Sequence, residues 1–151
     1  MMKLALGCDH GGYDLMQVVK KHLDEKGIAY EDFGTYSKES CHYPVFGRAA
    51  AEAVASGKCD KGIVICTTGI GISITANKVH GIRCALCCNT YTAEMCRRHN
   101  NANVLAMGAN VVTPEQAVEM VDTFLSTEFE GGRHATRVDM MMAIEQEYEK
   151  K

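Results

Sequence analysis

The segment Gly62–Ser73 places the strongest constraint on the fold, because within a few residues it changes from strand-like to helix-like sequence. Ile63, Val64 and Ile65 form a continuous apolar run, which predicts a strand buried on both faces, as in a parallel sheet. A polar, glycine-rich loop follows, and Ile72 begins a segment of helical character. The segment therefore predicts a strand, a tight loop and a helix in direct succession.

Cys66 stands at the carboxyl end of this predicted strand, directly before Gly69-x-Gly71. A loop of this kind points backbone N–H groups outward at a helix N-terminus, where anions and developing negative charge are stabilised. The positive end of the helix dipole also favours ionisation of a neighbouring thiol. We interpret Cys66 as a candidate base or nucleophile beside a candidate oxyanion site.

Strand-like and helix-like segments alternate along the rest of the chain. Pro44 can open one helix at its first turn, and Gly27 and Gly57 stand where two helices would end. The alternation predicts an α/β fold, a Rossmann-like three-layer αβα sandwich with a five-stranded parallel sheet. With no linker or repeat, we expect a single domain over residues 1–151. The other strands are predicted at Lys3–Cys8, Ile28–Phe33, Arg83–Cys87 and Asn103–Met107, and a last helix at about 134–149.

The composition excludes several classes of protein. The 151 residues carry a net charge of −3 and their basic side chains form no stripe, which argues against a nucleic-acid partner. No apolar run approaches the roughly 20 residues needed to cross a membrane, and no secretory signal is predicted at the N-terminus. We therefore expect a cytoplasmic protein with no membrane partner.

The eight cysteines are more typical of buried thiols in a reducing cell than of a disulfide framework. Cys84 and Cys87 match C-x-x-C, but residues three apart on a strand point to opposite faces and cannot chelate one ion. No second C-x-x-C completes a zinc site, so we expect no bound metal. We interpret Cys59, Cys84, Cys87 and Cys96 as small buried residues, and Cys66 as the exception because of its position.

Polar residues collect where the strands are predicted to end. In open α/β sheets, ligands bind outside the carboxyl ends of the strands. The predicted ends bring five segments to that edge of the sheet: Asp9–His10, 34–43, 66–73, 89–90 and 108–110.

Several candidate residues also have a purely structural interpretation. Asp9 could be a hydrogen-bonded loop residue or a helix cap, and His99 could cap the end of a helix. Arg133 and Arg137 share a helix face and could form a solvated basic edge. Taken together, histidines, a thiol, an anion-binding loop and two guanidinium groups suit an anionic substrate on which a proton must be moved.

A set of short motifs runs in order along the whole chain. They are Gly7-Cys8-Asp9-His10-Gly11-Gly12, Asp32-Phe33-Gly34-Thr35, Tyr43-Pro44, the segment 62–73, Ala76-Asn77-Lys78, Gly81-Ile82-Arg83, and the segments 99–104 and 130–138. This set resembles type B ribose-5-phosphate isomerase. The wider family includes galactose-6-phosphate isomerase subunits and members that act on allose or allose phosphate.

The resemblance implies a pentose phosphate pathway enzyme that interconverts ribose 5-phosphate and ribulose 5-phosphate through an enediolate, without metal or organic cofactor. It implies that Cys66 is the base, that Thr68 shuttles protons, and that His99 opens the sugar ring. The other implied site residues hold the substrate: Asp9 and Asn100 position the sugar, Tyr43 lines the pocket, the amides of Gly69, Ile70, Gly71, Ile72 and Ser73 form an oxyanion hole, and His10, Arg133 and Arg137 bind phosphate.

The resemblance also implies a homodimer or homotetramer whose sites take residues from two subunits. The last predicted helix carries Met140, Met141 and Met142 with Val138 and Ile144, which is more apolar surface than one helix face needs. Packing of this helix on a partner subunit is one interpretation, and packing on its own domain is the alternative.

Two positions depart from the family pattern. Thr67 stands where the family commonly has Gly, and Asn110 stands where an Arg commonly contributes to phosphate binding. A neutral amide cannot replace the charge of a guanidinium group. Because of these two differences, allose, allose 6-phosphate and galactose 6-phosphate remain alternative substrates.

Two other classes of function stay open. A non-catalytic phosphate- or nucleotide-binding module would need the glycine-rich loop but neither Cys66 nor His99. A thiol redox protein is suggested by the cysteine count, although no C-x-x-C opens a helix.

Overall fold

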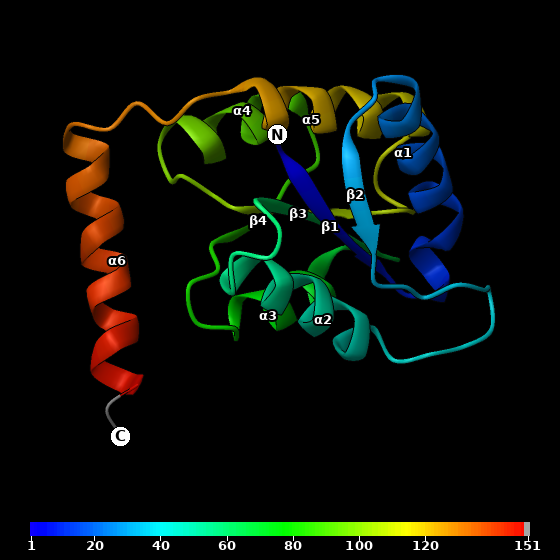
Figure 1. Cartoon of the computed structure of the whole chain (residues 1–151), viewed down its shortest axis with the longest axis horizontal. Helices are drawn as coiled ribbons and strands as arrows, with labels where there is room; N and C mark the ends of the chain where they lie inside the picture. Colours follow the sequence, from blue (N-terminus) through cyan, green and yellow to red (C-terminus); the bar gives the residue numbers. More distant parts are fainter. Residues whose placement is uncertain (150–151) are drawn as a thin grey trace.

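The computed structural model describes residues 1–149, in which five parallel strands form one sheet (Figure 1). The strand order is β2-β1-β3-β5-β4. The central strands are buried along almost their whole length, as expected of strands covered on both faces. The strands are β1 (Lys3–Cys8), β2 (Ala29–Asp32), β3 (Lys61–Cys66), β4 (Cys84–Leu86) and β5 (Val104–Gly108).

Helices cover both faces of the sheet and confirm the predicted α/β sandwich (Figure 1). Strand residues such as Leu6, Ile65 and Met107 face one core, and Ala5, Val64 and Ala106 face the other, because successive strand side chains alternate between faces. The first core is covered by α1 (Tyr13–Glu25), α4 (Thr90–Arg98) and α5 (Pro114–Ser126), and the second by α2 (Tyr43–Ala55) and α3 (Ile70–Asn77).

The last helix, α6 (Arg133–Glu149), stands outside these layers beside the β4 edge (Figure 1). It contacts its own chain through Met142, whose Sδ lies 3.4 Å from Arg83 Nη1, and through Glu145, which accepts a hydrogen bond from the Gly81 N–H at 3.0 Å. Its outer face remains exposed and carries Met140 and Ile144, whereas Met141 lines a cavity between α6 and the rest of the chain. The helix therefore packs in part on its own chain and still presents uncovered apolar surface.

Several element boundaries differ from the predicted ones by one or two residues. β4 is three residues long because Arg83 N–H donates to the Asn103 side chain (2.8 Å) before the strand ladder begins. α2 begins at Tyr43, one residue before Pro44, and α6 begins at Arg133. A short 3₁₀ helix, η1 (His10–Gly12), precedes α1.

The cysteines behave largely as predicted. Cys84 packs against the core under α2 and α3, whereas Cys87 lies in the core under α1, α4 and α5, so the C-x-x-C pair points to opposite faces. All eight cysteines are free thiols within the described residues. No helix in residues 1–149 has the length and apolar character needed to cross a membrane.

Candidate active site

Cys66 ends β3 with its side chain almost buried, 5% exposed, against the start of α3. Its Sγ accepts a hydrogen bond from the Gly69 N–H at 3.1 Å. Gly69 has a left-handed φ of 79°, and a Cβ there would lie 2.5 Å from the Leu86 side chain and 2.7 Å from the Met107 backbone. Only glycine fits a left-handed turn in so little space, and that turn directs the Gly69 N–H back at the sulfur.

The N-terminal end of α3 is open to a ligand. Gly69 provides no side-chain cap, and Thr68 Oγ1 accepts from the Ile70 N–H at 3.2 Å. The amides of Gly71 and Ile72 belong to the first turn, where helical N–H groups have no carbonyl partner within the helix. The Ser73 N–H donates to the Gly69 carbonyl at 3.1 Å, and the Gly69 and Ile70 amides are also engaged, so the predicted oxyanion hole of five amides is corrected to Gly71 and Ile72. The Ile72 side chain is fully buried, so it can serve the site only through its backbone.

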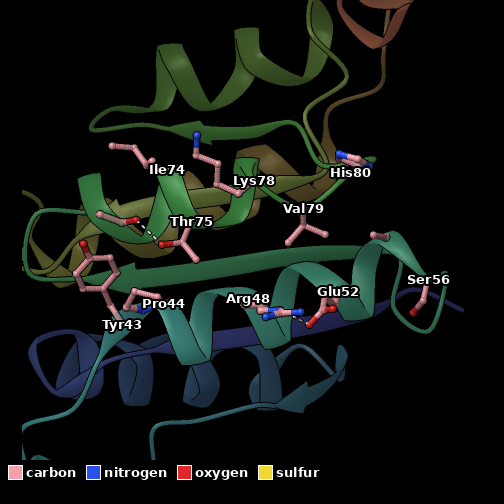
Figure 2. A pocket seen from close by; sticks show the side chains of 12 residues that line it. Tyr43, Pro44, Arg48, Glu52, Ser56, Ile74, Thr75, Lys78, Val79 and His80 are labelled. Carbon is pink, nitrogen blue, oxygen red and sulfur yellow. Dashed lines mark hydrogen bonds and ion pairs between the residues drawn. The ribbon is translucent and has the colours of Figure 1, made fainter. Parts of the chain in front are cut away.

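Tyr43 lies directly over this helix end. A Cβ on Gly71 would meet the Tyr43 ring at 2.5 Å, so the ring packs on the helix backbone where a side chain would otherwise stand. Tyr43 is 39% exposed and lies at one end of a groove between α2 and α3 (Figure 2).

The loop after β1 lies beside the loop after β3. Asp9 is buried and its Oδ1 accepts from the Gly12 N–H at 3.0 Å, so the helix-cap interpretation of Asp9 is confirmed. His10 is exposed, and its Nδ1 accepts from the Cys41 N–H at 3.2 Å. Thr67 Oγ1 sits where a Cβ on Gly11 would be, which is how this loop accommodates the branched residue.

Asn110 reaches the same edge from β5. Its N–H donates to the Thr67 carbonyl at 3.0 Å, and Ala109 N–H donates to the Cys66 carbonyl at 2.9 Å. Gly108 allows this approach, since a Cβ there would lie 2.4 Å from the Thr68 backbone. The carboxyl edge thus assembles one group of predicted residues, the Cys66 half-site: Asp9, His10, Tyr43, Cys66, Thr68, Gly69, Ile70, Gly71, Ile72, Ser73 and Asn110.

His99 and Asn100 lie at the opposite end of the sheet. α4 begins after the carboxyl end of β4 and returns antiparallel to the strands, so His99 caps its end shortly before β5 begins. The Asn100 carbonyl accepts from Arg83 Nε at 3.1 Å, at the amino end of β4. The length of β5, roughly 13 Å for four residue steps, separates this end from Cys66. A single chain therefore does not bring His99 to Cys66.

Arg133 and Arg137 belong with His99 rather than with Cys66. Both are exposed on the first turns of α6, and the intervening residue His134 stacks on His99 with ring centroids 4.1 Å apart and planes 7° apart. We call His99, Asn100, Arg133 and Arg137 the His99 half-site.

Glu130 and His134 complete this end, and the sequence did not assign them a role. Glu130 Oε1 lies 3.5 Å from His134 Nε2, and its Oε2 lies 3.9 Å from His99 Nε2. Hydrogen bonding to Arg98 holds the pKa of Glu130 below its usual range, and burial lowers the pKa of His134. The only available signal was a carboxylate and one histidine on either side of Gly131-Gly132, because the ring stack depends on how α6 packs against α4.

The groove between α2 and α3, the α2–α3 groove, has a volume of about 1010 Å³ and runs from Tyr43 to His80 (Figure 2). Its walls combine apolar side chains such as Ile74 and Val79 with the charged groups of Arg48, Glu52 and Lys78. It adjoins the Cys66 half-site through Tyr43 and Gly71, but Cys66 itself does not line it.

One other cysteine near the site is unsuited to proton transfer. Cys8 ends β1, and burial, reinforced by Asp32, raises the pKa of its thiol to about 12. Its thiolate is therefore scarce at neutral pH, so Cys8 is a poor candidate for the base.

Comparisons with known proteins identify the family of this chain. The profile of the family described as Ribose/Galactose Isomerase matches residues 4–141. Ribose-5-phosphate isomerase B of Escherichia coli (strain K12) is 49% identical over 97% of this chain and 98% of its own length. D-erythrulose-4-phosphate isomerase of Pectobacterium atrosepticum is 41% identical, with 92% of each chain covered. The solved structure of Clostridium thermocellum ribose-5-phosphate isomerase B superposes with a TM-score of 0.96 at 55% identity, covering 97% of this chain and 99% of that chain. The chain is therefore a member of the ribose/galactose isomerase family.

Proposed function

We propose that this protein is a sugar-phosphate aldose–ketose isomerase that interconverts ribose 5-phosphate and ribulose 5-phosphate. Family membership supports the reaction class, and relatives named as ribose-5-phosphate isomerase B support the substrate. The observation that carries the proposal is the contact between Cys66 Sγ and the N-terminal turn of α3.

The proposed chemistry moves one proton between two carbons. In the aldose-to-ketose direction, the Cys66 thiolate takes the C2 proton, the C2–H electron pair forms the C1=C2 bond, and the carbonyl electrons move onto O1. The thiol then returns a proton to C1, while O2 loses its proton and O1 gains one. In this proposal Thr68 exchanges the oxygen-bound protons, and the Gly71 and Ile72 amides stabilise the enediolate charge.

The His99 half-site supplies what the Cys66 half-site lacks. His99 opens the sugar ring by moving a proton from the anomeric hydroxyl to the ring oxygen. Arg133 and Arg137 provide the cationic groups that a phosphate needs, together with His10 from the other half-site. Because one chain separates these groups, a second copy must bring its His99 half-site to the Cys66 half-site of the first.

The α2–α3 groove is the surface that we assign to the second copy. It opens beside Tyr43, it has apolar walls, and His80 lies towards its far end. α6 offers arginines in its first turns and exposed apolar side chains in the middle, whereas Glu149 near its end already lies 3.4 Å from His80 of its own chain. A partner α6 lying parallel to α3 would place its arginines at the substrate and its apolar side chains along the groove.

A substrate panel tests the function. Purified protein is assayed with ribose 5-phosphate, allose 6-phosphate, galactose 6-phosphate, D-erythrose 4-phosphate, allose and ribose. Ribose 5-phosphate is expected to give the highest kcat/KM. A higher value for another sugar would move the assignment within the family, where relatives are named for galactose 6-phosphate and D-erythrulose 4-phosphate. Phosphate binding without turnover of any sugar would favour a non-catalytic module.

A further inference from the structure

The most unusual contact in the described chain is the stack of His99 and His134, and its consequence rests on the isomerase function proposed above. The two rings are almost parallel, 4.1 Å between centroids, and come from different elements, the end of α4 and the first turn of α6. His99 is partly exposed, while His134 behind it is only 7% exposed. The buried ring therefore supports one face of the ring that meets solvent.

His134 is the more buried of the two rings, and the environment of its Nε2 atom is unusual. Its Nε2 is buried and has no hydrogen-bond partner among the described residues; the nearest acceptor, Glu130 Oε1, lies 3.5 Å away. Four groups face it, namely His99 from α4, Glu130 from the preceding loop, and Arg133 and Arg137 from its own helix, and burial with the cationic groups lowers its pKa. The neutral ring can thus lie against a cation on His99 without repulsion.

Glu130 is held in place by contacts on its far side. Arg98 Nε donates to Glu130 Oε2 at 2.5 Å, and the Glu130 N–H donates to the Arg98 carbonyl at 3.0 Å. Arg98 is held in turn by Glu94, whose Oε2 lies 2.8 Å from Nη1. The carboxylate is consequently fixed between the Nε2 atoms of the two imidazoles rather than free to rotate into solvent.

We propose that Glu130 and His134 are positioning residues for His99: the buried imidazole supports its ring face, the carboxylate faces its Nε2 edge, and Nδ1 is left to exchange protons with the sugar. When His99 takes the O1 proton, the O1–H electrons form the C1=O1 bond, the C1–O4 bond breaks, and O4 receives a proton as His99 returns to neutrality. Glu130 stabilises the imidazolium that exists between these two transfers.

A shared metal ion is the other chemistry that this trio suggests, since one ligand atom from each of His99, Glu130 and His134 lies within 4.8 Å of the others. The stack argues against it. A metal prefers to lie in the plane of each ligating imidazole, and two parallel rings direct their lone pairs side by side rather than towards one point. Glu130 is also already paired with Arg98.

The test compares a substrate that forms a furanose ring with one that does not. D-erythrose 4-phosphate cannot close such a ring because its C4 oxygen carries the phosphate, and ribulose 5-phosphate is open-chain as well. Glu130→Gln and His134→Ala are expected to lower kcat/KM for ribose 5-phosphate by roughly 10- to 100-fold and to change the two open-chain substrates little. His134→Phe, which keeps a ring face, should lose less than His134→Ala.

Glu94→Gln is the matched control, because it removes the other carboxylate on Arg98 without touching His99. Nitrogen NMR of the His99 ring gives a readout besides activity: its tautomer should change in Glu130→Gln and not in Glu94→Gln. The positioning role would be overturned if kcat/KM fell equally for all three substrates. It would also be overturned if the ratio of kcat/KM for ribose 5-phosphate to kcat/KM for the open-chain substrates kept its wild-type value in both Glu130→Gln and His134→Ala. Zn²⁺ dependence of wild-type ring opening that EDTA abolishes would overturn it as well. If the wild type converted none of the substrates, the isomerase function would fail and the inference with it.

Discussion

Cys66 and His134 are both buried side chains, and they differ in what surrounds their polar atom. Cys66 Sγ faces an amide donor and the open turn of α3, whereas His134 Nε2 has no hydrogen-bond partner among the described residues. The first arrangement gives the sulfur a hydrogen-bond donor, whereas burial in the second lowers the pKa of the imidazole. Two tests at this scale follow from that difference.

Replacing Cys66 with Ala should remove proton transfer while leaving the pocket intact. We expect kcat to fall by about 100- to 10,000-fold, the usual contribution of a general base. Binding of an unreactive sugar phosphate, measured by calorimetry, should change little. Cys59→Ala is the control, because Cys59 is a buried cysteine outside the site. A Cys66→Ala enzyme with near-normal kcat would rule out Cys66 as the base.

His134 should make stability depend on pH. Its folded pKa lies below its unfolded value of about 6.5, so as pH falls below that value the unfolded chain binds a proton that the folded chain does not. Stability should therefore decrease with acidification from pH 6.5 towards the folded pKa of His134. Urea midpoints at about pH 7.5 and 5.5 should differ less in His134→Phe than in the wild type. The same change of urea midpoint with pH in the two proteins would contradict this account.

Asn110 provides a gain-of-function test at the site. Its backbone amide pairs with Thr67 while the side chain is exposed, so a larger side chain can be accommodated. A hydrogen bond to a charged group contributes roughly 1.5–3 kcal/mol, so Asn110→Arg should lower KM for ribose 5-phosphate about tenfold or more. Free ribose should be unaffected. No improvement in KM would favour a shifted substrate preference instead.

Among the elements, α3 depends most on one backbone position. Gly69 and Gly57 both have a left-handed φ, 79° and 83°, but a Cβ on Gly57 would meet nothing within 4 Å. Gly57→Ala should therefore lower the free energy of unfolding only by the cost of the left-handed conformation, about 1–2 kcal/mol. Gly69→Ala should lose about 1–3 kcal/mol more, because the new Cβ meets Leu86 and the Met107 backbone. Equal losses in chemical denaturation would show that the crowding around Gly69 relaxes freely.

The whole molecule is tested by mixing two defective forms. If each site combines Cys66 of one copy with His99 of another, a heterodimer of Cys66→Ala and His99→Asn chains contains one fully native site. Random exchange in an equal mixture should then restore about a quarter of wild-type activity on ribose 5-phosphate, as expected for a two-fold symmetric dimer. Light scattering should give at least twice the 16.5 kDa chain mass, and Ile144→Glu should reduce it. No recovery on mixing would place the site within one chain.

The sequence was most informative about the centre of the fold and one edge of the sheet. The continuous apolar run of β3 predicted a buried parallel strand, and the rule that ligands bind at carboxyl ends correctly grouped Asp9, Cys66 and Asn110. His99 was tied to them only by resemblance, because its position depends on α4 returning antiparallel to the strands. The contacts of Glu130 and His134 were beyond prediction, since a ring stack between two helices leaves no periodic signal in the sequence.

Because the two half-sites of one chain lie apart, activity on cyclic substrate should depend on how far the protein is diluted. A correctly folded lone chain would hold the base at one end of its sheet and the ring-opening imidazole at the other, and would be inert towards cyclic substrate. If the active form is the proposed dimer, specific activity near its dissociation constant would rise with enzyme concentration rather than stay constant. Residues that do not contact the sugar, such as Met140 and Ile144, would then control activity through subunit association.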